Sequence, residues 1–300
     1  MKNKSLLYRF NIYQKERFPF AILVFTTLSV VLSSSVIVIT SDDSILNHLP
    51  GIIIGTLTCL LFMFNIRVFD DFKDERFDSR FHKERPVQKG IITLNEINFL
   101  NIAGLSIQIL LNVFYSLSAF FWWLLALAYS LIARMEFFMK GWIRKRFFIY
   151  NALNLLQIFF LQIYLYKLIE PALSWKNNLL FIHFIFVLFN AGLLDVARKL
   201  KRKEDETEGK DTYSSRLGME TASFMYSCVC LIVYGLFLYL LFSLKKSFIL
   251  FYASLIPLAV VITSTILYLS WKNKASTKVV EGLAILFYLS MHLLLVFTRI

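Results

Sequence analysis

The feature that most constrains this chain is a series of apolar runs, each about twenty residues long, separated by short charged segments. An α-helix needs about this length to cross the hydrocarbon core of a bilayer. A closed membrane barrel would instead show stretches of alternating polarity, about ten residues each. The pattern therefore predicts an all-α fold, a polytopic membrane helical bundle in which every spanning element is a helix.

Nine transmembrane helices are expected, and the whole chain, residues 1–300, is expected to form a single transmembrane domain. Hydrophobic residues make up 58% of the chain and charged residues only 17%, whereas an average soluble domain is about a quarter charged. The predicted spans are residues 18–40, 50–68, 94–115, 119–139, 147–168, 178–197, 220–243, 247–270 and 278–298.

The net charge of +12 is explained by where the basic residues fall. With nine spans, the N-terminus and alternate loops share one side of the membrane, and that side holds 27 of the 32 Lys and Arg residues. The positive-inside rule then places the N-terminus and the charged loops in the cytoplasm and the C-terminus outside. We expect an integral, multi-pass protein of a bacterial cell membrane, in contact with membrane lipid, with no nucleic-acid partner; the oligomeric state is left open.

Acidic residues gather in two of the cytoplasmic segments, and the first directly follows the second span. Asp70, Asp74 and Asp78 are four residues apart, so one helix would place them along a single face. Mg2+ prefers oxygen ligands and is often held by one or two carboxylates together with phosphate oxygens. A solvated, mixed-charge loop is the alternative interpretation, but carboxylates that abut an apolar span are costly. The segment therefore predicts a Mg2+–diphosphate site.

Two stretches of this segment resemble the UbiA superfamily of intramembrane prenyltransferases. The run DDFKDERFD, Asp70–Asp78, is similar to the family's Asn-Asp-x-x-Asp-x-x-x-Asp motif, with Asp70 in the place of the usual Asn. The run RPVQKGIIT, Arg85–Thr93, resembles the Arg-Pro-x-x-x-Gly-x-Ile-Ser stretch that follows it.

The second acidic segment, which follows the sixth span, also resembles the family, but with a departure. Its GKDTYSSRLG run, Gly209–Gly218, is similar to the end of the family's second motif, and Asp205 falls on the last Asp of that motif. The earlier acidic position falls on Lys201, which cannot bind Mg2+ but could contact a phosphate oxygen.

The resemblance implies Mg2+-dependent transfer of a prenyl group from a polyprenyl diphosphate to a hydrophobic, membrane-embedded acceptor, aromatic or lipid, through an allylic carbocation. It implies Mg2+ as the cofactor. The catalytic acids would be Asp70, Asp74, Asp78 and Asp205, and the metal ligands would be drawn from these together with Asp71 and Glu208. Diphosphate contacts are expected from Arg85, Lys140 and Lys201.

Polar residues on two later spans complete the set of candidates. Asn151 and Asn154 are three residues apart on the fifth span and could line an acceptor pocket or form hydrogen bonds between helices. Glu136 and Lys140 are four residues apart and can pair on one helix face.

Other activities on the same fold stay open. A membrane terpene cyclase or a prenyl-diphosphate lyase would release diphosphate without an external acceptor. A non-catalytic lipid or ion binding or transport protein would bind its ligand without turnover, and the Lys201 departure keeps this alternative in view.

Overall fold

The computed structural model describes residues 4–39, 43–206, 212–245, 247–271 and 274–299. Within these ranges the chain forms helices and no strand, and nine of the helices are long and apolar enough to cross a membrane. They are α2 (Phe20–Val38), α3 (Leu49–Lys73), α5 (Leu94–Tyr115), α6 (Leu117–Arg134), α8 (Phe147–Ile169), α9 (Asn178–Arg198), α11 (Met219–Leu244), α12 (Phe248–Ser270) and α13 (Lys274–Val296). The predicted all-α helical bundle is confirmed.

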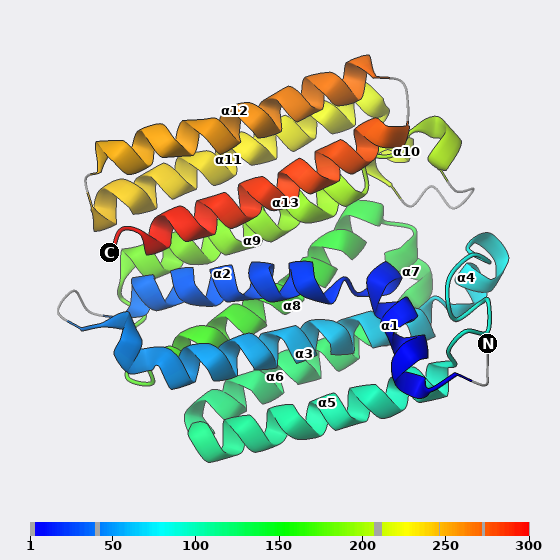
Figure 1. Ribbon diagram of the computed structural model, residues 1–300, viewed down its shortest axis with the longest axis horizontal. Helices are drawn as coiled ribbons and strands as arrows, with labels where there is room; N and C mark the ends of the chain where they lie inside the picture. The colour runs from blue at the N-terminus through cyan, green and yellow to red at the C-terminus, as the bar shows by residue number, and fades with distance from the viewer. Residues whose placement is uncertain (1–3, 40–42, 207–211, 246, 272–273, 300) are drawn as a thin grey trace.

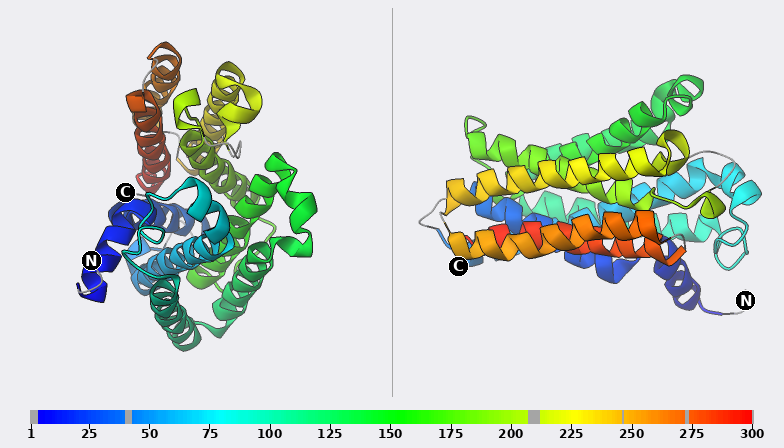
Figure 2. Two further views of the ribbon diagram at one scale, coloured as in Figure 1. Left: turned by 90° about the vertical axis from the view of Figure 1, so that its right-hand side faces the viewer. Right: turned by 90° about the horizontal axis from the view of Figure 1, so that it is seen from above.

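The long helices run roughly side by side along the long axis of the molecule (Figures 1 and 2). Short helices join them: α1 (Leu6–Arg17), η1 (Ile45–His48), α4 (Glu75–Phe81), η2 (Glu136–Phe138), α7 (Lys140–Arg144), η3 (Lys203–Asp205) and α10 (Tyr213–Leu217). Four of these, α1, α4, α7 and α10, lie at one end of the bundle, on the right in Figure 1. We call this the acidic end, because both acidic segments reach it.

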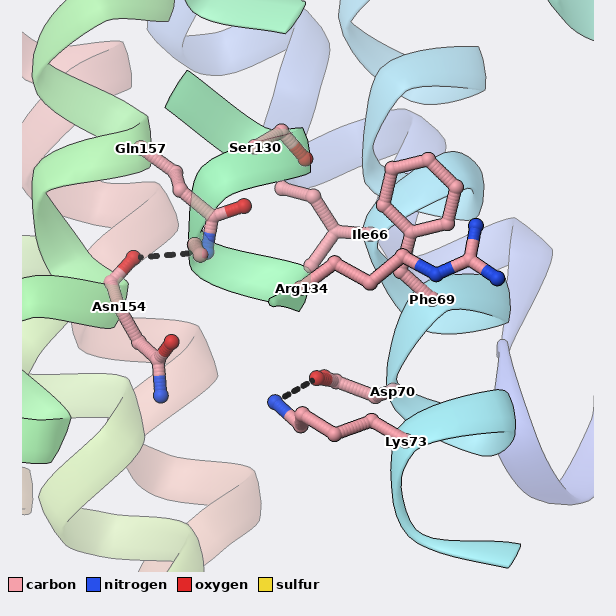
Figure 3. A pocket seen from close by; sticks show the side chains of 9 residues that line it. Ile66, Phe69, Asp70, Lys73, Ser130, Arg134, Asn154 and Gln157 are labelled. Carbon is pink, nitrogen blue, oxygen red and sulfur yellow. Dashed lines mark hydrogen bonds and ion pairs between the residues drawn. The ribbon is translucent and has the colours of Figure 1, made fainter. Parts of the chain in front are cut away.

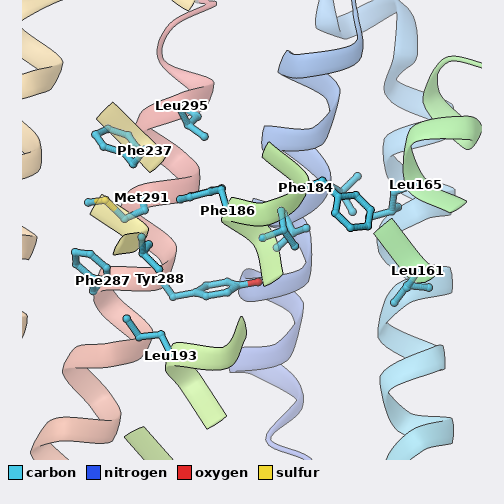
Figure 4. Packing of buried hydrophobic residues seen from close by; sticks show 14 of the residues in the cluster. Leu161, Leu165, Phe184, Phe186, Leu193, Phe237, Phe287, Tyr288, Met291 and Leu295 are labelled. Atoms are coloured by element: carbon cyan, nitrogen blue, oxygen red, sulfur yellow. The ribbon is translucent and has the colours of Figure 1, made fainter. Parts of the chain in front are cut away.

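Apolar side chains fill the bundle and also cover its outside. Phe186 and Phe237 are fully buried in the core between α9, α11 and α13 (Figure 4). On the outer surface, Phe114 and Ile249 are 85% and 81% exposed. Large apolar side chains scattered over the surface of spanning helices are suited to contact with lipid tails.

A buried polar network links four helices away from the acidic end. The Ser33 hydroxyl of α2 lies 2.8 Å from Nδ1 of His292 on α13 and 3.2 Å from Nε2 of His183 on α9. Nδ1 of His183 lies 2.7 Å from the Tyr166 hydroxyl of α8. Because no water reaches a bilayer interior, side chains of this kind satisfy one another and hold the helices together.

The structure differs from the prediction where α3 meets the first acidic segment. We predicted that the span ends at residue 68, but α3 continues to Lys73 and carries Asp70 in its last turn. The helix then divides at Asp74, whose φ and ψ are −99° and 6°, and α4 follows. The expectation that one continuous helix carries Asp70, Asp74 and Asp78 is therefore wrong.

A second difference lies after α6, which ends at Arg134 instead of residue 139. Glu136, Phe137 and Phe138 all have positive φ, at 51°, 54° and 58°. This left-handed turn breaks the helix, so Glu136 and Lys140 do not share a helix face. Glu136 instead accepts a 2.7 Å hydrogen bond from Nε of Arg144.

The sequence pattern gave no indication of α1, which crosses the acidic end before the first span. Arg9 of α1 donates two hydrogen bonds, of 2.8 and 2.6 Å, to the carboxylate of Glu96 in α5. Glu96 also caps α5 through Thr93 in a capping box. The helix α1 is thus fastened to the start of α5.

Candidate functional site

A small pocket at the acidic end brings together residues of α3, α6 and α8. Asp70 and Lys73 line it from α3, and Asn154 and Gln157 line it from α8 (Figure 3). Nζ of Lys73 lies 2.7 Å from an Asp70 oxygen, and the Lys73 side chain is only 6% exposed. Two of the predicted candidates, Asp70 after the second span and Asn154 on the fifth span, therefore face the same space.

Asp74 lies just beyond this pocket, at the junction of α3 and α4. Its side chain is 37% exposed, the same fraction as that of Asp70. Nη2 of Arg144 is 3.7 Å from one of its oxygens. Partial burial raises the pKa of the Asp74 carboxyl to about 6, because the charged form loses hydration, and Asp70 adds to the shift against the opposing effect of Lys73.

Asp71 turns to the other side of α3 and is held by α1. Its side chain is 4% exposed, and one oxygen accepts a 2.5 Å hydrogen bond from the Tyr13 hydroxyl. The other oxygen lies 2.6 Å from Nη2 of Arg17 and also pairs with Arg67. Burial beside this carboxylate raises the pKa of the Tyr13 phenol above its ordinary range. Both Asp71 oxygens thus have protein partners.

Asp78 is likewise engaged by basic residues. It pairs with Arg85, and Nη2 of Arg17 lies 3.7 Å from the same Asp78 oxygen. The Asp78 side chain is 4% exposed. The structure therefore brings Asp78 and Arg85 together as an ion pair, and Arg17 bridges Asp71 and Asp78.

The second acidic segment is anchored to α12. The backbone N–H of Lys201 donates to the Ser214 hydroxyl (2.8 Å), and the carbonyl of Lys201 accepts from the Tyr268 hydroxyl (2.9 Å). The buried Arg202 guanidinium bonds to the Tyr268 carbonyl and lies 4.5 Å from the centroid of the Tyr268 ring. Asp205 is half-buried at the end of η3, and Glu208 lies outside the described residues.

Asn151 belongs to a different cluster from Asn154. Its side-chain oxygen accepts a 2.7 Å hydrogen bond from Nζ of Lys199, which also lies 2.9 Å from Asp195. The Tyr213 hydroxyl donates to Asp195 at 3.4 Å, and burial together with this anion raises the pKa of the Tyr213 phenol above its ordinary range. The two Asn residues predicted to line one acceptor pocket therefore lie in separate polar groups.

Lys140 begins α7 and has an exposed side chain. The segment before it holds a buried carboxylate, Glu136, which is 3% exposed and pairs with Arg144. Arg144 thus lies between Glu136 and Asp74, and it connects the turn after α6 to the first acidic segment.

The sequence model of the UbiA prenyltransferase family matches residues 23–291. This chain belongs to that family. The match runs from the first predicted span to the last and confirms the resemblance seen in the two acidic segments.

Solved structures of a UbiA homolog from Archaeoglobus fulgidus share the fold. One, bound to DMAPP and Mg2+, is 16% identical, has a TM-score of 0.57, and covers 93% of this chain and 98% of its own. Another, bound to GPP and Mg2+, is 15% identical with the same TM-score, and covers 94% and 99%. A search of curated proteins gave no match.

The acidic residues of this UbiA family member suit a cation whose coordination shell is completed mainly by water and by the phosphate oxygens of a bound molecule. In the part of the chain that the structure describes, no group of three or more His, Cys, Asp or Glu side chains is arranged to hold a metal ion. Asp70 and Asp74 are each 37% exposed, whereas Asp71 and Asp78 are buried in ion pairs. Mg2+ commonly uses one or two carboxylates and completes its shell with water and phosphate oxygens.

Three residues that position the first motif of this UbiA chain were missed by sequence reasoning. Arg67 lies four residues before Asp71 on α3, a spacing that could have indicated the pair. Tyr13 and Arg17 are also four residues apart, but their role depends on how α1 packs against α3, which no local pattern reveals.

Proposed function

We propose that this chain transfers a prenyl group from a prenyl diphosphate to an acceptor in the membrane, in a reaction that requires Mg2+. The match to the prenyltransferase family carries the proposal. It is supported by two half-exposed carboxylates, Asp70 and Asp74, at the mouth of an apolar bundle. The structures of the A. fulgidus homolog, which hold DMAPP or GPP with Mg2+, support the same choice of substrate and cation.

We assign Asp70 and Asp74 as the first-motif ligands of the cation, with Asp205 as the candidate from the second segment. Asp71 and Asp78 are assigned to fixing the segment through their ion pairs. Lys201 and Lys140 remain the proposed diphosphate contacts. When bound, Mg2+ would neutralise the negative charge that grows on the leaving diphosphate.

The residues of the chain bind and orient the prenyl diphosphate and the acceptor, and they exclude water from the reacting carbon. The bond between the allylic carbon and the diphosphate oxygen breaks, and its electron pair leaves with the diphosphate. An electron pair of the acceptor then forms the new bond to that carbon, and the acceptor loses a proton to water. The apolar interior keeps water from the allylic cation before the acceptor reacts. Aromatic faces stabilise that cation.

We further propose that the acidic end faces the cytoplasm and that the C-terminus lies outside. The basic residues support this orientation, because 27 of the 32 Lys and Arg residues fall on the side of the acidic end. A prenyl diphosphate made in the cytoplasm would then reach Asp70 and Asp74 without crossing the membrane.

Calorimetric titration of the purified protein with GPP, with and without Mg2+, tests the proposed substrate and cation. We expect binding that needs Mg2+ and that weakens by at least about tenfold in Asp74→Asn, because a charged ligand of the cation is lost. Glu75→Gln is the matched control, since Glu75 is adjacent, acidic and exposed. Equal GPP affinity in both variants, or GPP binding that does not depend on Mg2+, would refute the assignment.

A further inference from the structure

The turn after α6 holds a buried carboxylate, Glu136, that is only half satisfied. Its side chain is 3% exposed, and its Oε2 has no hydrogen-bond partner. Among the described residues this is the one carboxylate oxygen buried in such a state; both Asp71 oxygens, by contrast, have protein partners. A buried anionic oxygen without a donor or a cation beside it is costly. Oε2 is therefore suited to a positively charged partner that arrives from outside the chain.

The backbone adopts an unfavourable conformation where it places this carboxylate. Glu136, Phe137 and Phe138 are three consecutive non-glycine residues with positive φ, and each such residue costs free energy. Phe138 is 77% exposed, so burial of its side chain does not offset that cost. The turn directs the Glu136 side chain inward, where it meets Arg144 of α7. Backbone strain of this kind is concentrated at functional sites.

Arg144 lies between the Glu136 carboxylate and that of Asp74. Its Nη2 is 2.5 Å from Oε1 of Glu136 and 3.7 Å from Oδ1 of Asp74. Its Nε donates to the same Oε1 at 2.7 Å, so the guanidinium contacts one Glu136 oxygen twice and leaves Oε2 unbonded. The contact with Asp74 is long and half-exposed, and ion pairs of this kind are weak. The guanidinium thus occupies this position without fully satisfying either carboxylate.

A divalent cation suits the same position better. The two carboxylates carry two negative charges, of which Arg144 balances one and a divalent cation balances both. Mg2+ takes one or two carboxylates and completes its shell with water and phosphate oxygens. Asp74 is 37% exposed, so water and a diphosphate can reach the position. The Arg144 side chain is 40% exposed, so it can turn outward when a cation enters.

We infer that Glu136 is a further ligand of the divalent cation, beside Asp74, and that Arg144 occupies the place of the cation until the cation binds. The inference deepens the proposed function and rests on it, because it adds a carboxylate from the turn after α6 to those of the first acidic segment. Glu136 and Arg144 lie outside both stretches that resemble the family motifs.

Titration with Mn2+ alone tests the inference, because the EPR signal of the free ion falls when the ion binds. The full-length protein is placed in nanodiscs of phosphatidylcholine, whose headgroup carries no net charge. We expect Arg144→Met to bind Mn2+ about 3- to 5-fold more tightly than wild type, since the competing guanidinium is gone. Glu136→Gln should bind it about tenfold more weakly, since a charged ligand is lost. In the double variant the gain from Arg144→Met should disappear.

Lys145→Met and Glu75→Gln are the matched controls, because each removes the same charge from an exposed residue at the acidic end. They should change the Mn2+ affinity by less than about twofold, since water and salt screen exposed charges. Tighter binding by Arg144→Met cannot arise from a loss of fold. Arg144→Met that binds Mn2+ no better than Lys145→Met would overturn the inference. Glu136→Gln that binds no worse than Glu75→Gln would also overturn it and would assign Oε2 to a bound water.

Mg2+-dependent GPP binding by the same proteins separates this inference from the proposed function. Glu136→Gln should weaken that binding, and Glu75→Gln should not. If the Mn2+ affinities shift as expected but wild-type protein fails to bind GPP, the proposed donor substrate is wrong and the ligand assignment stands. If GPP binding needs Mg2+ but is unchanged in Glu136→Gln, the ligand assignment fails alone.

Discussion

At Asp74 a proton and a divalent cation compete for the same carboxylate. Its pKa of about 6 lies above the ordinary range of an Asp, so the group is half protonated near pH 6 and ionised above pH 7. We expect the Mg2+-dependent affinity for prenyl diphosphate to fall as the pH drops through about 6 and to level off above 7. Titrations between pH 5 and 8 measure this, and Asp74→Asn should flatten the profile. A wild-type profile that is already flat would contradict the assignment.

Arg17 is the residue that joins both buried carboxylates of the first motif. In Arg17→Met, Asp71 keeps Arg67 and Asp78 keeps Arg85, so only part of each interaction is lost. We expect the free energy of unfolding to fall by roughly 1–3 kcal/mol, measured as a lower melting temperature in detergent. The exposed Arg80→Met serves as the control and should change little. An unaltered melting temperature in Arg17→Met would show that α1 does not hold the motif.

At the scale of residues, the sequence indicated which acidic residues form the first motif but not which side chains pair with them. The motif spacing identified Asp70, Asp74 and Asp78, and the family match supports the motif in which they lie. Asp78 is buried and Asp70 and Asp74 are half-exposed, and this difference depends on Arg17 and on Arg85, which approach Asp78 from other elements. Contacts of that kind follow from packing and leave no local pattern in the sequence.

At the scale of elements, hydropathy predicted the nine spans. An apolar run that crosses the membrane forms a helix, because a helix satisfies all its backbone hydrogen bonds internally where no water is present. The predicted 94–115 span agrees with α5 at both ends. The left-handed turn after α6 could not be predicted, because Glu136–Phe138 contains no glycine, asparagine or proline to signal it. The interactions of Arg144 with Glu136 and Asp74 hold the chain there instead.

This turn gives a prediction about backbone strain. Phe138 has a φ of 58° and a side chain that is 77% exposed, so Phe138→Gly removes an unfavourable left-handed conformation with little loss of packing. We expect the variant to be more stable by about 0.5–1 kcal/mol, measured by thermal melting. The neighbouring Met139, at φ −121°, is the control, and Met139→Gly should be destabilising. Equal losses in both variants would rule out relief of strain.

At the scale of the whole molecule, the distribution of charge predicts the orientation in the membrane. A membrane-impermeant maleimide should label Lys176→Cys in intact cells, because the α8–α9 connection is expected outside. Lys145→Cys, at the acidic end, should be labelled only after lysis. The unmodified chain is the background control, since Cys59 and Cys230 are buried and Cys228 is half-buried. The reverse labelling pattern would invert the proposed topology.

The most direct measurement for the whole molecule is the release of pyrophosphate from a panel of allylic prenyl diphosphates, with and without Mg2+ and an extract of native membrane lipids. We predict release that needs both Mg2+ and the extract, that is lost in Asp74→Asn and that is kept in Glu75→Gln. Release without the extract would contradict transfer to an acceptor and indicate a cyclase or lyase. No release from any donor, despite Mg2+-dependent binding, would contradict catalysis itself.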